Sequence, residues 1–143
     1  MELTKRMRVK MFKVFTYVWM LCVGLLLSGC VTAVHNNHRT PMELARHFVN
    51  SGIPIVQAQR LSPDPFMANE ALAIMVDDVE LGIYKYNTDT AVQKKRIERY
   101  EETGRAYILG IPYPIAVQGS FMLMGWEKSP KKKAILEAFR NFR

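Results

Sequence analysis

The alternation of apolar and polar positions divides the chain into an apolar N-terminal run followed by short amphipathic segments. A helix is predicted from Thr40, because Thr-Pro-Met-Glu combines a capping hydroxyl, a proline at the first helical position and a reciprocal carboxylate at Glu43. The apolar stripe of this helix consists of Met42, Ala45, Phe48 and Val49. Gly52 marks its end, and residues 53–61 are predicted to form a strand that Ser62-Pro63-Asp64-Pro65 ends.

Residues 71–86 alternate in the manner of a β-hairpin with Asp77-Asp78 as its turn. This register places three aliphatic pairs on one face, namely Val76 with Val79, Ile74 with Leu81 and Leu72 with Ile83. The opposite face is mixed and carries Ala73, Met75, Glu80 and Tyr84. Asp77, Asp78 and Glu80 also suggest a cation site or an acid–base pair, but turn chemistry and strand alternation account for them.

The second half of the chain continues the same kind of pattern. Residues 90–103 are predicted to form a helix that stops at Gly104, and residues 105–111 a strand. Residues 115–117 and 120–124 can pair around Gln118-Gly119. Ser129 is the predicted cap of a last helix with Pro130 at its first position, and the stripe of this helix is Ile135, Leu136, Phe139 and Phe142. The order α-β-ββ-α-β-ββ-α predicts a single small α+β domain, with a largely antiparallel sheet and helices on one face.

The N-terminus has a different composition. Residues 1–13 are basic, and residues 14–27 contain no charge. A basic head, an apolar middle and small residues after it describe a secretory signal. The first 29 residues hold five of the 20 basic residues and one of the 13 acidic ones, so the rest of the chain carries +3 rather than +7. We therefore predict no nucleic-acid partner, because most of the basicity belongs to the signal.

The residues Leu27-Ser28-Gly29-Cys30 resemble the lipobox of bacterial lipoproteins. In that family, diacylglycerol is attached to the cysteine thiol and a dedicated peptidase then cuts just before the cysteine. The resemblance implies a signal peptide at 1–29, cleavage between Gly29 and Cys30, a lipidated tether at 30–39 and a domain at 40–143. Cys22 lies in the segment that would be removed, so Cys30 is left without an intramolecular disulfide partner and no CxxC pair exists.

An uncleaved membrane helix is the alternative, because residues 14–34 are uncharged over a length that can span a bilayer. Both interpretations keep the basic N-terminus in the cytoplasm and place the domain outside, anchored to the membrane. In Gram-negative lipoproteins, an aspartate just after the cysteine tends to retain the protein at the inner membrane. Val31 occupies that position here, so the resemblance implies the periplasmic face of the outer membrane if the host is Gram-negative.

Two short polar motifs are candidate sites. His35 and His38 lie three residues apart, but a metal site needs three or four ligands, so a solvated tether is predicted and no metal or cofactor. Lys131, Lys132 and Lys133 make the last helix basic. These lysines are candidates for contact with anionic lipid headgroups, and an ordinary solvated helix face is the alternative.

The segment Gly110-Ile111-Pro112-Tyr113-Pro114, with the strands and helix after it, resembles the C-terminal half of thioredoxin-like folds. The CxxC pair of that family is absent here, and a tight hairpin stands where the family has a parallel β-α-β unit. The resemblance therefore implies a thioredoxin-like accessory domain without redox cysteines. A parallel central sheet with a cis peptide bond at Pro112 would favour this alternative.

No Ser/His/Asp spacing, phosphate loop or metalloprotease motif is visible, although catalytic groups can converge from distant positions. We therefore predict a membrane-anchored envelope lipoprotein with a non-enzymatic binding or structural domain, whose partner is an unidentified envelope protein or other envelope component. A small hydrolase remains the enzymatic alternative. A deep pocket with converging titratable groups would favour it.

Overall fold

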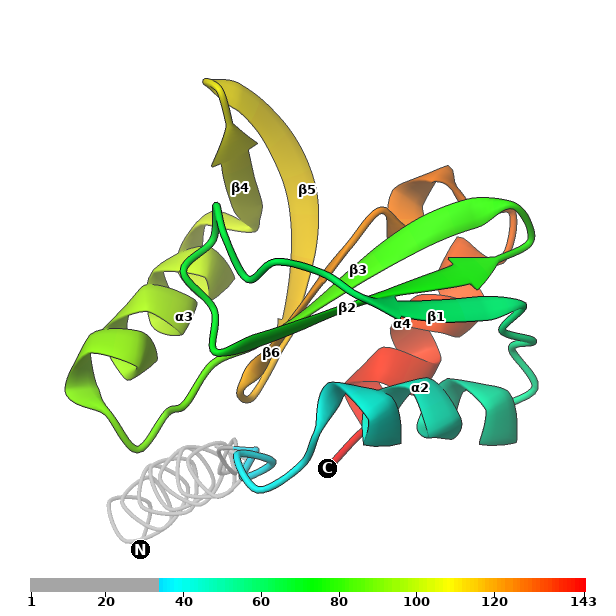
Figure 1. The fold of residues 1–143 in the computed structure, drawn as a ribbon, viewed down its shortest axis with the longest axis horizontal. Coiled ribbons are helices and arrows are strands. Elements are labelled where there is room, and N and C mark those ends of the chain that lie inside the picture. The colour runs from blue at the N-terminus through cyan, green and yellow to red at the C-terminus, as the bar shows by residue number, and fades with distance from the viewer. Residues whose placement is uncertain (1–33) are drawn as a thin grey trace, which may run out of the picture. The chain divides into compact units, whose positions relative to one another are not determined.

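Six antiparallel strands form one sheet in the order β1-β2-β3-β6-β5-β4 (Figure 1), in a computed structural model that describes residues 34–143. The elements are α2 (Pro41–Asn50), β1 (Gln57–Arg60), β2 (Glu70–Val76), β3 (Val79–Lys85), α3 (Ala91–Thr103), β4 (Arg105–Ile108), β5 (Ile111–Gln118), β6 (Phe121–Met124), the short 3₁₀ helix η1 (Trp126–Lys128) and α4 (Lys132–Asn141). The predicted α+β class, the antiparallel sheet and the order of elements are confirmed. No helix in this part of the chain is both long and apolar enough to cross a bilayer.

Helix α2 begins with the predicted capping box. The hydroxyl of Thr40 accepts the backbone N–H of Glu43 at 3.2 Å, and a carboxylate oxygen of Glu43 accepts the N–H of Thr40 at 2.8 Å. The predicted apolar stripe is only partly correct. Ala45 and Phe48 are buried, but Met42 and Val49 are about half exposed. Their places toward the core are taken by Pro41 and Leu44, so the buried stripe is rotated around the helix relative to the prediction.

The β2–β3 hairpin has the predicted register. Val76 lies opposite Val79, Ile74 opposite Leu81 and Leu72 opposite Ile83. Asp77 and Asp78 both have positive φ, at 47° and 61°, as a two-residue turn of the primed type requires. The hairpin therefore presents a continuous aliphatic row to the helices that cover it.

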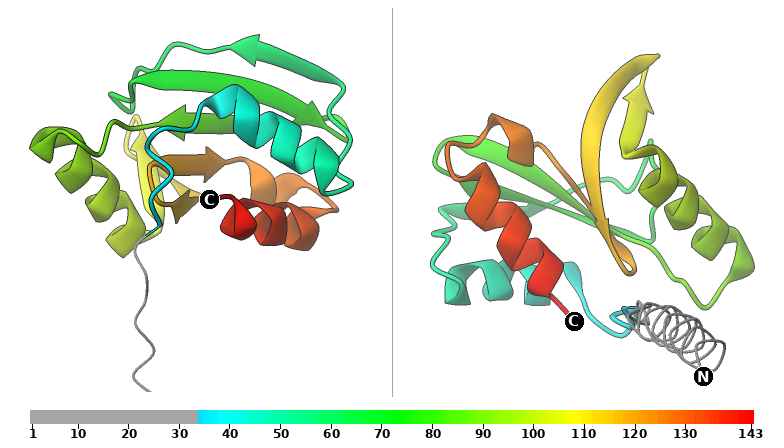
Figure 2. Two further views of the ribbon diagram at one scale, coloured as in Figure 1. Left: turned by 90° about the horizontal axis from the view of Figure 1, so that it is seen from below. Right: turned by 180° about the vertical axis from the view of Figure 1, so that it is seen from behind.

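The first hydrophobic core lies between this row and helices α2 and α4. Figure 2 shows the two helices together against one side of the sheet, with α3 apart from them. The side chains of this core come from both helices and from β2, β3 and β6, and its fully buried members include Leu44, Phe48, Ile74, Leu81, Ile83, Phe121, Leu123, Ile135 and Phe139.

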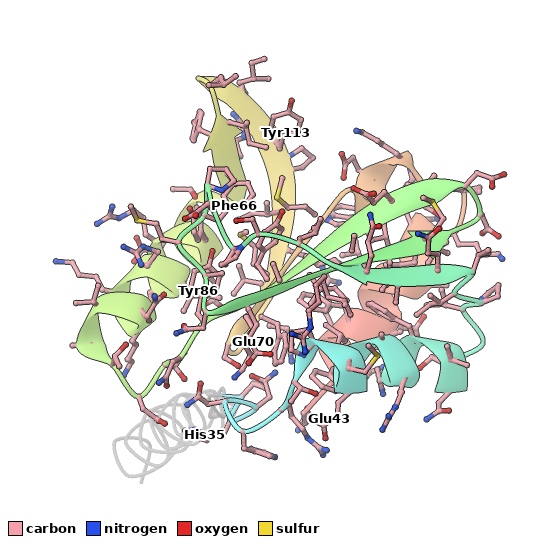
Figure 3. All side chains as sticks on the ribbon, viewed as in Figure 1. His35, Glu43, Phe66, Glu70, Tyr86 and Tyr113 are labelled. Atoms are coloured by element: carbon pink, nitrogen blue, oxygen red, sulfur yellow. The ribbon has the colours of Figure 1, made fainter. Side chains whose placement is uncertain are left out.

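A second core occupies the opposite face of the sheet. Tyr84 and Met122, which alternate with the residues of the first core, pack here with Ile97 of α3. Phe66, from the connection between β1 and β2, closes this core, and its carbonyl accepts the hydroxyl of buried Tyr86 at 3.2 Å (Figure 3). The prediction of helices on one face thus holds for α2 and α4 and is wrong for α3. The face predicted to be mixed is buried at Ala73 and Tyr84 and exposed at Glu80.

Three strand predictions need correction. The strand predicted at 53–61 is limited to β1, because Ile53 is buried in the first core instead. The strand predicted at 105–111 is interrupted by a turn at Leu109-Gly110, where both residues have positive φ. The last pair of β5 and β6 is Gln118 with Phe121, so their turn is Gly119-Ser120 and not Gln118-Gly119.

The start of the last helix also differs from the prediction. Gly125 has a φ of 81°, which turns the chain into η1, and Ser129 ends that 3₁₀ helix. The hydroxyl of Ser129 still accepts the N–H of Lys131 at 3.1 Å, but α4 begins only at Lys132. The prediction of a cap at Ser129 with Pro130 as first helical residue is therefore wrong, because α4 begins two residues after Pro130. Ile135, Phe139 and Phe142 are buried as predicted, whereas Leu136 is only partly buried.

Candidate attachment and interaction surfaces

The predicted lipid attachment and cleavage site, Gly29 and Cys30, lies outside the described residues. The described chain begins just after it, at Val34. The distal part of the predicted tether can therefore be compared with the structure.

The segment from Asn36 to Arg39 belongs to the folded domain. Asn36 is completely buried, and its side-chain oxygen accepts the N–H and the hydroxyl of Ser120 at 2.8 and 2.9 Å. Its amide nitrogen donates to the carbonyl of Gln118 at 3.1 Å. The prediction of a solvated tether up to residue 39 is thus wrong from Asn36 onward, although His35 and His38 are exposed. No local pattern predicts this docking, because an asparagine is typical of solvated loops as well.

Asn37 attaches the same segment to the end of β3. Its carbonyl accepts the ammonium of Lys85 at 2.6 Å, and its side-chain oxygen accepts the N–H of Thr88 at 3.0 Å. Lys85 is buried and its ammonium lies 5.6 Å from the centroid of the Phe121 ring. Burial lowers the pKa of Lys85, while the charges of nearby carboxylates act in the opposite direction. Lys85 thus links the first described residues to strand β3 of the sheet.

The three candidate membrane-contact lysines lie at the other end of the β2–β3 hairpin. The ammonium of Lys131 forms an ion pair with the carboxylate of Asp77, in the hairpin turn, at 2.9 Å. Lys132 and Lys133 are exposed, and no ion pair joins them to another of residues 34–143. The structure therefore gives Asp77 a cationic partner. Within the same residues, no three His, Cys, Asp or Glu side chains gather in a geometry that holds a metal ion.

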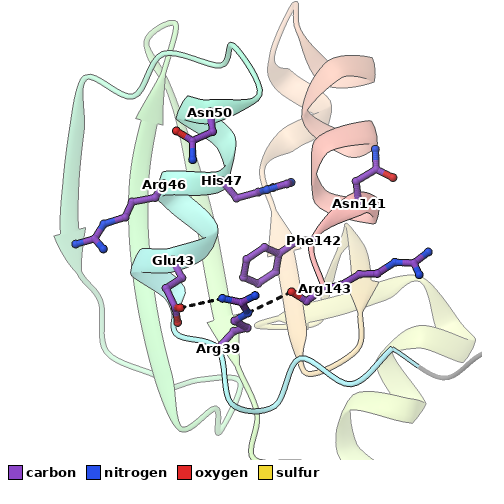
Figure 4. Close-up of a pocket in the computed structure, with 8 residues that line it drawn as sticks. All are labelled: Arg39, Glu43, Arg46, His47, Asn50, Asn141, Phe142 and Arg143. Atoms are coloured by element: carbon purple, nitrogen blue, oxygen red, sulfur yellow. Dashed lines mark hydrogen bonds and ion pairs between the residues drawn. The ribbon is translucent and has the colours of Figure 1, made fainter.

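A pocket of about 410 Å³ opens between α2 and the end of α4 (Figure 4). Arg39 lies in it and donates to the carboxylate of Glu43 and to the carbonyl of Arg143, each at 3.2 Å. His47 is hydrogen bonded to the carbonyl of Ala138 at 2.9 Å. Figure 4 shows the side chains of Arg46 and Arg143 pointing away to either side. Arg39, Glu43 and His47 are hydrogen bonded to protein partners, and the titratable groups do not converge on one position.

The electrostatics of this pocket fit a structural role. The hydrogen bonds from the Thr40 backbone and from Arg39 hold the pKa of Glu43 below its usual value. A general acid or base near neutral pH would need a shift in the opposite direction for a carboxyl group. The arrangement required for the hydrolase alternative is therefore not found in this pocket.

The β4–β5 hairpin exposes an apolar end. The exposed fractions are 60% for Tyr107, 98% for Leu109 and 56% for Ile111, and Figure 1 shows this hairpin rising beyond the rest of the sheet. The apolar pattern predicts a continuous strand over residues 105–111, which includes Leu109 and Gly110 of the turn. The Leu-Gly dipeptide was the available turn signal, since a glycine after an apolar run is typical of a hairpin turn.

All five strand pairings are antiparallel, so the parallel sheet that would favour a thioredoxin-like domain is not found among the described strands. Comparison with protein-family models, with curated proteins and with solved structures found no match to this chain.

Proposed function

We propose that this protein is an exported envelope lipoprotein whose domain, held to the membrane by lipid on Cys30, serves as a binding or structural module. The observation that supports attachment is Leu27-Ser28-Gly29-Cys30 placed directly behind a basic head and an uncharged run. The non-enzymatic role is supported by the pocket between α2 and α4, where Arg39, Glu43 and His47 are engaged in structural hydrogen bonds.

The docking of Asn36 shortens the proposed tether between the lipid and the domain. Asn36 is fixed to the domain, so only Val31 to His35 lie between it and Cys30. Six residue steps reach at most about 22 Å when fully extended. A lipid on Cys30 would therefore keep the domain close to the membrane surface, with the Asn36 end of the domain nearest to the anchor.

Metabolic labelling with palmitate tests the attachment. The full-length chain is expressed in a Gram-negative bacterium, and we expect label in the wild type and in Cys22→Ala, and none in Cys30→Ala. Cys22→Ala is the matched control, because it removes the other cysteine of the chain. Equal labelling of wild type and Cys30→Ala would contradict lipidation at Cys30. An intact mass that still includes residues 1–29 would favour the uncleaved membrane helix.

The destination of the protein is part of the same proposal. Val31 in place of an aspartate supports transfer to the periplasmic face of the outer membrane in a Gram-negative host. Membrane fractionation tests this, with Val31→Asp as the comparison that should shift the protein to the inner-membrane fraction. Wild-type protein that sediments with inner-membrane markers would contradict the outer-membrane location.

A further inference from the structure

Strand β1 forms an open edge of the sheet, and Figure 2 shows it as the outermost strand on the side of α2. Antiparallel pairs alternate between hydrogen-bonded and non-hydrogen-bonded ones. Leu61 donates its N–H to the carbonyl of Ala71 at 3.1 Å, in continuation of the β1–β2 register, so Gln59, two residues earlier, also directs its backbone groups toward β2. Ala58 and Arg60 therefore direct their N–H and C=O groups outward, away from β2.

These outward backbone groups have the geometry to bind the backbone of another extended chain. All four residues of β1 are exposed, so no other part of residues 34–143 covers this edge. The strand contains no proline, which would remove an outward donor. An open edge of this kind recognises an extended segment through main-chain hydrogen bonds, while pockets beside it select the side chains.

A groove of about 410 Å³ lies between β1 and α2 and can select those side chains. Its apolar members Met42, Val49 and Val56 expose 45%, 53% and 78% of their surfaces. Ala58 lies opposite Ile74 of the first core, so the α2 side is the face on which every second side chain of an added strand would lie. The full lining is Met42, Ala45, Arg46, Val49, Asn50, Ile55, Val56, Gln57 and Ala58.

The charge along this edge is positive. Arg46 is the one charged residue that lines the groove. Arg60 and Glu70 line a pocket that adjoins the groove at Met42, so the two arginines outnumber the carboxylate. All three charged side chains are exposed, and the ion pairs found within residues 34–143 include none of them. The edge therefore favours an acidic occupant.

We propose that β1 accepts an extended segment of a partner protein as a seventh strand, with apolar side chains over the groove and an acidic side chain beside Arg46. This inference rests on the binding role proposed above and specifies the kind of partner, but it does not depend on lipid at Cys30. A second copy of the chain is the less suitable occupant. Its other open edge strand, β4, begins with exposed Arg105, which has the same charge as Arg46.

Fluorescence polarisation with a designed peptide tests the contact. The labelled, capped peptide has threonine at every odd position and glutamate, valine, valine and glutamate in turn at the even positions. The lipid-free protein from Val31 onward is used, because both cores and every described strand pairing lie within residues 34–143. We expect saturable binding of this peptide. The same peptide methylated on the three central backbone nitrogens should not bind, because the methyl groups remove its donors to β1.

Two variants test the edge and the groove separately. Ala58→Pro removes an outward N–H that makes no bond to β2, so it should melt like the wild type and weaken peptide binding about tenfold. Arg46→Glu should weaken it about fivefold, and a peptide with lysine in place of glutamate should restore binding to this variant. Lys94→Glu is the matched control, because it makes the same charge change on exposed α3, outside the groove.

The proposal would be overturned if the peptide shows no saturable binding up to its solubility limit, or if the methylated peptide binds equally well. Equal losses in Arg46→Glu and Lys94→Glu would also overturn it, because the attraction would then be unspecific. Should Ala58→Pro fail to fold, the methylated peptide and the charge exchange at Arg46 still decide the question. Dimers of the wild type in sedimentation velocity that Ala58→Pro abolishes would overturn it by assigning the edge to a second copy. Displacement of the peptide by phosphatidylglycerol vesicles would overturn it by assigning the groove to lipid.

Discussion

The side-chain oxygen of Asn36 accepts hydrogen bonds from both the backbone N–H and the hydroxyl of Ser120, 84 positions later in the sequence. The turn is shaped for this contact. Gly119 has a φ of 59°, and a Cβ at this position would collide with the Asn36 side chain. The first described residues are thus an integral part of the fold.

Asn36→Ala should destabilise the domain by roughly 1–3 kcal/mol, because it leaves buried polar groups of the β5–β6 turn without partners. The measurement is thermal unfolding of the protein from Val31 onward. His35→Ala is the control, since His35 is exposed, and its midpoint should match the wild type. An unchanged midpoint for Asn36→Ala would show that the segment does not contribute to stability.

Ile74→Asp should unfold the domain, whereas Glu80→Lys should change its stability by less than about 0.5 kcal/mol. Ile74 is 1% exposed within the aliphatic row, and an unpaired carboxylate there costs several kcal/mol, roughly the whole stability of a small domain. Glu80 is exposed on the neighbouring strand. Circular dichroism of the two variants distinguishes them, and equal melting curves would contradict the energetic importance of this row.

Local patterns were sufficient to predict those elements whose signals lie within a few residues of one another. The Thr40 capping box and the register of the 72–83 hairpin depend on short spacings, and both are confirmed. The outlines of α3 and the α+β order follow from the same kind of signal.

Features that depend on distant residues were not predicted. Tyr84 is buried because α3 and Phe66 cover its face of the sheet, and no pattern within the hairpin shows that covering. The docking of Asn36 joins residues that lie 84 positions apart in the sequence. The exposure of Leu109 follows from its position at the end of a projecting hairpin, whereas its apolar character alone predicts burial. An apolar pattern indicates which side chains favour burial, but the tertiary packing decides which of them are covered.

The Thr40–Glu43 capping box should make stability depend on pH at the acid end. The pKa of Glu43 is held below its usual value of 4.5 by hydrogen bonds to its ionised form. A lowered pKa in the folded state contributes stability above pH 4.5, and that contribution is lost as the pH falls through the folded-state pKa. Melting temperatures measured from neutral pH to below 4.5 should therefore fall less steeply for Glu43→Gln than for the wild type. Identical slopes would show that this carboxylate is not stabilised by folding.

Helix α4 offers a test of membrane contact that separates its three lysines. Each lysine near an anionic surface contributes about 1 kcal/mol to binding. The charge of Lys131 is already compensated by Asp77, so Lys132 and Lys133 would carry most of the attraction. Two lysines correspond to about 2 kcal/mol, or roughly a 30-fold change in partitioning onto anionic vesicles.

We therefore expect weak, salt-sensitive binding of the lipid-free protein to phosphatidylglycerol vesicles. The double change of Lys132 and Lys133 to Gln should abolish this binding. The matched control is the double change Lys131→Gln with Asp77→Asn, which removes the ion pair without changing the net charge and should therefore leave the binding nearly unchanged. Absence of binding at low salt would contradict contact through α4 and leave this helix face in solvent. Binding that is insensitive to salt would also contradict it, because attraction between exposed charges is screened by added ions.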